Sequence, residues 1–234
     1  MQWALFNLDG LAFLLRWGHF IFGIAWIGML WYFNFVQGPF FAETDAAVKN
    51  AATQKLVPRA LWYFRWGAMG TVITGWLIIG IRMHQEFVIN SSWGVTIFTG
   101  AIMGTLMWFN VWFVIWPRQK KIIAAANGEK VDNLPVLARR AFLASRTNTL
   151  LSVPLLFFMG AARNLTIQAD FSKVGVWFGA ILAILLLIEI NALTADKGTT
   201  TKPIEKIKGV IISGLVLTAV FYVLLEVLIP RVSG

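Results

Sequence analysis

The sequence has no cysteine, two histidines and few charged residues. Only 13% of its 234 residues are Asp, Glu, Lys or Arg, while 58% are hydrophobic; about a quarter of the residues in a soluble domain are charged. The absence of cysteine excludes disulfides, thiolate metal sites, cysteine nucleophiles and covalent attachment of c-type haem to this chain. The small charged fraction excludes an ordinary soluble domain and indicates an integral membrane protein.

Long uncharged segments predict where the chain crosses the membrane. Residues 17–42 and 87–117 contain no Asp, Glu, Lys or Arg, and each exceeds the roughly 20 residues that span about 30 Å of hydrocarbon. Four shorter segments can also span the membrane if each is allowed at most one ionisable residue. We therefore expect an all-α membrane bundle, a single domain over residues 1–234. Its six transmembrane helices are expected at about residues 11–36, 61–81, 94–116, 147–162, 174–193 and 209–229, with a cytoplasmic loop at 117–146.

Lys and Arg are concentrated in alternate connections between these helices. Three lie between helices one and two, seven between helices three and four, and four between helices five and six. Because basic loops stay on the cytoplasmic side, we expect both termini on the outer, periplasmic side of a bacterial inner membrane. The formal charge of +9 is therefore a topology signal. No basic patch is interleaved with stacking aromatics, so no nucleic-acid partner is expected.

Ionisable residues inside the expected helices fall into two layers. Arg16, His19 and Glu226 lie near the outer face, whereas Arg65 and Glu189 lie near the cytoplasmic face. A charge at membrane depth costs several kcal/mol unless it is paired or hydrated. We therefore expect two buried polar pairs, Arg16 with Glu226 and Arg65 with Glu189. Snorkelling of the arginines and of Glu226 toward the nearest interface is the alternative.

His19 shares one helix face with Arg16, Gly23 and Trp26, because the spacings along the chain are three, four and three residues. A neutral imidazole can ligate haem iron, and an Arg one turn away can pair with a propionate. The pattern predicts a b-type haem site with His19 as the metal ligand and with Arg16 and Trp26 beside the macrocycle. The alternative is a packing histidine that bonds to a neighbouring helix.

A second axial histidine within one chain could come only from His84, just beyond helix two. The expected depths of His19 and His84 differ by about 10 Å, which is awkward for two ligands of one iron. The alternatives are that His19 alone ligates the iron, or that two subunits each provide one His19.

Four segments resemble the membrane domain of the cytochrome c-linked urate oxidase (urate hydroxylase) family. They are LLRWGHFIFGIAWIGMLWYF, PRALWYFRWGAMGTVITGWLI, NVWFVIWPRQKKI and RTNTLLSVPLLFFMGAARN. The resemblance covers most of the chain up to about residue 165 and fades after it. Its most specific parts are the block that carries His19 and the block at Asn148–Met159. It implies a multi-helix bundle with an outward N-terminus, followed by further helices and an outward cytochrome c domain, whose C-x-x-C-H motif this sequence lacks.

Several positions depart from that family's pattern. The family has a histidine where Trp62 stands, an acidic residue where Gly67 stands, and a further histidine where this chain has Ala161-Ala162-Arg163. A His-Gly-Gly-Gly stretch is also missing, so His19 alone remains of those histidines. Because urate oxidation needs groups that bind an anionic purine and accept its protons, we expect a relative without urate oxidase activity.

Three functions remain open. The first is a redox or electron-transfer module that binds haem b through His19 and passes electrons to a quinone or an outward partner. The second is a non-catalytic accessory subunit of a larger respiratory or photosynthetic membrane complex, or a homo-oligomer. The third is a small-molecule or ion carrier that uses the layer of Arg65 and Glu189. It is the weakest, because no pair of helices broken by Gly or Pro marks a midplane site. The lipid bilayer is a partner in every case.

Overall fold

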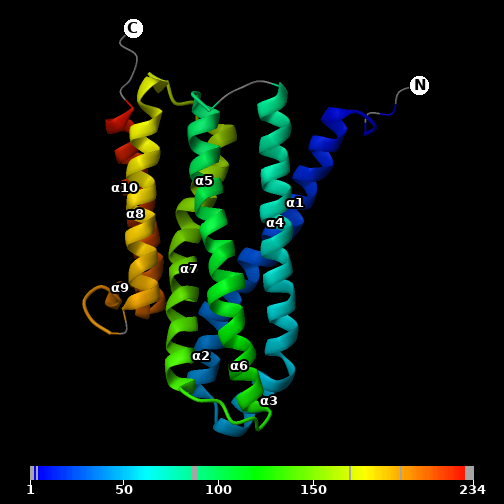
Figure 1. The fold of residues 1–234 in the computed structure, drawn as a ribbon, viewed down its shortest axis with the longest axis vertical. Coiled ribbons are helices and arrows are strands. Elements are labelled where there is room, and N and C mark those ends of the chain that lie inside the picture. The colour runs from blue at the N-terminus through cyan, green and yellow to red at the C-terminus, as the bar shows by residue number, and fades with distance from the viewer. Residues whose placement is uncertain (1–2, 4, 86–88, 169, 196, 230–234) are drawn as a thin grey trace.

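The computed structural model describes residues 3, 5–85, 89–168, 170–195 and 197–229 (Figure 1). Within these residues every element is a helix, and six helical spans are long and apolar enough to cross a membrane. The expected all-α bundle of six membrane helices is thus confirmed. The spans are Leu8–Glu43, Val57–His84, Ser92–Ala126, Leu134–Asn164, Phe171–Thr194 and Ile207–Leu228.

Two of the spans are composite, because a π-helical turn interrupts the α-helix. The first span consists of α1 (Leu8–Trp31), η1 (Tyr32–Gln37) and α2 (Gly38–Glu43), and the third of α5 (Ser92–Phe109), η2 (Asn110–Ile115) and α6 (Trp116–Ala126). The other spans and the connecting helices are α4 (Val57–Gln85), α7 (Leu134–Asn164), η3 (Phe171–Lys173) with α8 (Val174–Thr194), α10 (Ile207–Leu228), α3 (Ala46–Lys55) and α9 (Lys202–Glu205).

The loop expected at 117–146 is mostly helix. α6 prolongs the third span to Ala126, and α7 begins at Leu134, so only residues 127–133 connect them. Gly128 turns the chain with a φ of +93°, a conformation that glycine adopts without strain. Pro135 stands in the first turn of α7, where its missing N–H leaves no bond unmade. The proline therefore stands at the start of the fourth span.

α7 is the central helix of the bundle. It packs against α5, α6, α8 and α10, and its membrane window is the most buried of the six. α8 and α10 lie at one edge, whereas α1 crosses behind α4 at the other edge (Figure 1). α1 packs chiefly on α4, and its window is the least buried.

Three glycines of α4 allow α1 to approach closely. A Cβ at Gly67 would lie 2.9 Å from the backbone nitrogen of Trp26, and one at Gly70 would lie 2.4 Å from the ring of Phe22. At Gly75 it would lie 3.0 Å from Cε1 of His19. In lipid, close packing replaces the hydrophobic effect as the force that joins helices. We call these three contacts the glycine seam.

The two ends of the bundle differ in charge. The described chain begins and ends at one end of the bundle, and the connections around α3, the α6–α7 turn and α9 lie toward the other (Figure 1).

Arg139 and Glu205 form an ion pair of 2.6 Å near this second end. The pKa of Glu205 is lowered below its usual value, chiefly by the hydrogen bond that Arg139 donates to it. The pair is therefore present at neutral pH and is lost only as the pH falls through that lowered pKa.

Substitution of Gly67 by Ala is expected to destabilise the α1–α4 pair. The new methyl group would meet the backbone of Trp26, which cannot rotate away, so we expect a loss of about 1 to 3 kcal/mol of unfolding free energy. The measurement is reversible denaturation in detergent. Gly80→Ala on the same helix is the control, because nothing lies within 4 Å of its added Cβ. Equal unfolding free energies of the two variants would contradict the role of the glycine seam in joining α1 to α4.

The orientation in the membrane can be measured with single cysteines, since the sequence has none of its own. With the basic connections in the cytoplasm, Asn127→Cys and Thr200→Cys should react with an impermeant thiol reagent only after cells are permeabilised. Asn90→Cys, between the second and third spans, should react in intact cells. The reverse pattern would place the termini inside.

Candidate functional site

His19 is held by a hydroxyl group of α4. Its Nδ1 lies 3.1 Å from Oγ1 of Thr74, and that hydroxyl lies 2.6 Å from the carbonyl oxygen of Gly70, to which it donates. Because the single hydroxyl hydrogen is used there, Thr74 accepts the bond from Nδ1–H of His19. With this assignment, a neutral imidazole carries its proton on Nδ1 and keeps a lone pair on Nε2.

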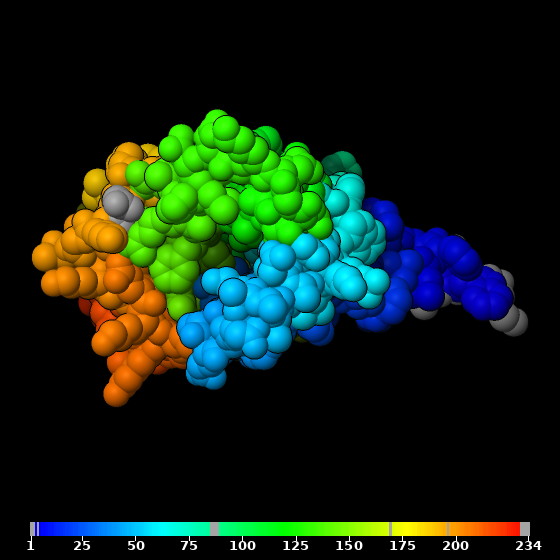
Figure 2. Space-filling view, turned by 90° about the horizontal axis from the view of Figure 1, so that it is seen from below, coloured from blue at the N-terminus to red at the C-terminus, as the bar shows by residue number. Residues whose placement is uncertain are grey.

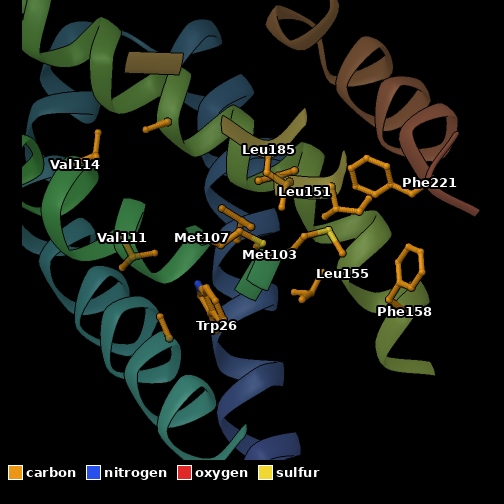
Figure 3. Close-up of a cluster of buried hydrophobic side chains, with 14 of the residues drawn as sticks. Trp26, Met103, Met107, Val111, Val114, Leu151, Leu155, Phe158, Leu185 and Phe221 are labelled. Atoms are coloured by element: carbon orange, nitrogen blue, oxygen red, sulfur yellow. The ribbon is translucent and has the colours of Figure 1, made fainter. Parts of the chain in front are cut away.

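The other residues expected around a haem lie on different surfaces. Trp26 is fully buried and packs in the core with Met103, Met107 and Val111 (Figure 3). Arg16 is exposed. His84 is also exposed, and it lies ten residues beyond Thr74 on α4, or about 15 Å along the helix. The structure does not bring His84 to His19.

Neither expected buried ion pair is formed in the described residues. Glu226 on α10 accepts a 2.9 Å bond from the hydroxyl of Tyr222, and α1, which carries Arg16, lies at the opposite edge of the bundle (Figure 1). The guanidinium of Arg65 stacks 3.9 Å from the ring centroid of Trp116.

Glu189 is bonded instead to the third span. It accepts a 2.9 Å hydrogen bond at Oε2 from Nδ2 of Asn110, whereas Arg65 reaches Trp116 of the same span. The side chains of Arg65 and Glu189 thus meet different residues of the third span. The predicted pairing of Arg65 with Glu189 is therefore wrong.

Asn110, Asn148 and Glu189 form a buried group that we call the Asn110 cluster. Nδ2 of Asn110 donates to Oδ1 of Asn148 at 3.0 Å as well as to Glu189, and Nδ2 of Asn148 donates to the carbonyl oxygen of Met107 at 2.9 Å. The two asparagines are fully buried and Glu189 is 6% exposed. The cluster thus joins the third, fourth and fifth spans through hydrogen bonds in the bundle interior.

The π-helical turn helps to build this cluster. η2 begins at Asn110, and at its end the N–H of Trp116 bonds to the carbonyl of Val111, five residues back. Such a widened turn disturbs the regular four-residue ladder, and π-turns often mark functional positions. The carbonyl of Met107, just before the turn, accepts the bond from Asn148.

η1 repeats this arrangement in the first span. Nδ2 of Asn34 donates to the carbonyl of Leu30 at 2.9 Å and to Oγ of Ser145 at 2.8 Å. Nε1 of Trp31 donates to Oγ of Ser152 at 3.0 Å. Both composite spans therefore bond to polar side chains of α7, which come from the block at 145–152.

The Asn110 cluster keeps two buried acceptors without a hydrogen-bond partner in the described residues, Oδ1 of Asn110 and Oε1 of Glu189. Arg146, on α7, has buried Nε and Nη1 atoms that find no partner in the part of the chain that the structure describes, and its guanidinium lies 5.1 Å from the ring centroid of Phe142. Buried polar atoms are normally bonded, so these atoms mark the interior positions where a ligand would be stabilised.

The sequence predictions missed Asn34 and Asn110, which carry no charge. A signal was present in the dipeptides Phe33-Asn34 and Phe109-Asn110, each of which lies within a long uncharged run. An amide within such a run must bond to protein, because lipid offers no partner.

The urate oxidase N-terminal family matches residues 79–224, more than half of the chain. The chain belongs to this family. No curated protein and no solved structure matches it. The membership confirms the predicted relationship, but its extent differs from the prediction. The match continues well past residue 165 and begins after the block that carries His19. The Asn110 cluster lies within the matched range, and His19 does not.

Substitution of Asn148 by Leu should weaken the bundle, because it removes a donor to Met107 and an acceptor for Asn110. We expect a loss of about 1 to 2 kcal/mol of unfolding free energy, measured by reversible denaturation in detergent. Asn164→Leu is the matched control, since this exposed residue of the same helix bonds only to its own turn at Gly160. Equal losses would show that the bonds of Asn148 add no specific stability.

Proposed function

We propose that this chain is a redox module of the bacterial inner membrane that binds b-type haem through Nε2 of His19. The observation that carries the proposal is the bond between Nδ1 of His19 and Thr74. A histidine ligand commonly donates its second N–H to a fixed acceptor, which sets the tautomer and the ring orientation. The bound haem would supply one-electron chemistry.

The residues near His19 fit a haem at the outer rim of the α1–α4 pair better than one inside it. The glycine seam fills the space between the two helices. Gly23, one turn beyond His19, has open space around its Cβ position, and Arg16, one turn before His19, is exposed and free to reach a propionate. Trp26 takes no part, because it packs in the core.

We further propose that the chain does not oxidise urate. At Gly67, where the resemblance to the family implies an acidic residue, an added Cβ would lie 2.9 Å from the backbone of Trp26. The tight packing of α1 on α4 thus leaves no room for a carboxylate there. A proton acceptor for an anionic purine would have to come from elsewhere.

A second candidate function is that of an accessory subunit in a larger respiratory or photosynthetic complex. It is supported by α1, which packs chiefly on α4 and exposes large side chains along its length, including Phe13, Trp17, Phe20 and Ile24. A partner helix or a second copy of this chain could cover them. Recovery with stoichiometric partners after gentle detergent extraction would support this role, whereas recovery only as a free monomer would count against it.

An absorption spectrum tests the haem proposal. Protein purified from haem-replete cells should show a Soret band that His19→Gln abolishes while circular dichroism stays unchanged. Thr74→Val should lower the haem affinity by about 10- to 100-fold, because the imidazole loses its orienting acceptor. His84→Gln is the control and should keep the band. The absence of the band, or its persistence in His19→Gln, would refute the proposal.

A further inference from the structure

The Asn110 cluster is the best-defined buried polar group of the bundle, and the haem proposal does not use it. Both amide hydrogens of Asn110 are committed, one to Asn148 and one to Glu189. Two oxygens, Oδ1 of Asn110 and Oε1 of Glu189, are buried with no donor in the described residues. The cluster therefore leaves two buried acceptors without a donor.

The surroundings of Glu189 are apolar. Leu185, one turn earlier on α8, is 2% exposed, and Met107 and Leu151 are fully buried. All three belong to the hydrophobic core (Figure 3). A carboxylate ion in such a place costs several kcal/mol unless a cation compensates it.

No cationic side chain of the described residues forms an ion pair with Glu189. α5 and η2 contain no charged residue. On α7, Arg140 donates to the backbone carbonyls of Thr194 and Ala195, and Arg146 lies over Phe142. On α10, the basic residue is Lys208, which lies in the first turn of the helix. The described residues thus supply no charge that compensates a carboxylate at Glu189.

A proton fits the cluster better than a metal ion. In the described part of the chain, no three His, Cys, Asp or Glu side chains gather as a metal site would need. Hard cations take six or more oxygen ligands, and only two oxygens are unpartnered here. A proton on Oε1 of Glu189 needs no further ligand, removes the charge, and leaves Oε2 as the acceptor for Asn110.

We propose that Glu189 is a proton-binding site, with the proton on Oε1 and with Asn110 and Asn148 holding the carboxyl group in place. Glu189 lies five residues before the end of α8, or about 8 Å along the helix. α8 ends at the end of the bundle where α3, the α6–α7 turn and α9 lie (Figure 1). The surface of that end is hollowed between α3, the α6–α7 connection and the segment around α9 (Figure 2). In this proposal the proton reaches Glu189 from that end of the bundle.

Infrared spectroscopy of the purified protein in lipid tests this site. At neutral pH the wild type should show the carbonyl band of a protonated carboxylic acid, which shifts in heavy water. Glu189→Gln should remove this band, and it keeps an oxygen that can accept from Asn110. Glu226→Gln is the matched control on α10 and should leave the band in place. Asn110→Leu should shift the band, because the carboxyl group loses a hydrogen-bond donor.

The outcomes separate the alternatives. Loss of the band in Glu189→Gln alone supports the proposal. The absence of such a band from the wild type, or its persistence in Glu189→Gln, overturns it. Removal of the wild-type band by saturating sodium or potassium ions would mean that the site takes a metal cation, which also overturns it. The haem spectrum is independent of these results, since His19 has no contact with the cluster.

Discussion

The constraint on which this structure depends is that lipid offers no hydrogen-bond partner to a polar group. Every amide and hydroxyl group in the interior must therefore bond to another part of the chain. α7 supplies three of these partners, Ser145, Asn148 and Ser152, and the first and third spans reach them with Asn34, Trp31 and Asn110. These bonds fix the depth at which each span meets α7, which non-directional packing cannot do by itself.

The same constraint explains why the π-turns lie where they do. Each composite span must keep an apolar surface toward lipid and also present an asparagine to α7. Five-residue hydrogen bonding changes the helical phase within a single turn, so the residues after the turn face a new direction. Asn34 lies within η1 and Asn110 begins η2. The buried hydrogen bonds to α7 and the π-helical turns therefore occur at the same positions.

The sequence predicted the number of spans and the end of the bundle that holds the basic connections, because both follow from the order of apolar and charged residues. It also led us to expect Arg65 and Glu189 in one layer near the cytoplasmic face. It could not predict their partners, since depth comes from counting residues along a helix, whereas the facing side depends on how neighbouring helices pack. Trp116 and Asn110 decide those contacts. The tautomer of His19 likewise depends on Thr74, 55 residues away, and no local pattern marks that hydroxyl.

The glycine seam also has a consequence for biogenesis. Its contacts join two spans that follow one another directly in the chain, and α1 packs chiefly on α4. The first two spans can therefore assemble as a helical hairpin while the ribosome is still translating the rest. The polar surface of α7 is synthesised only afterwards. It then docks onto a hairpin that already exists, so the order of synthesis favours correct assembly.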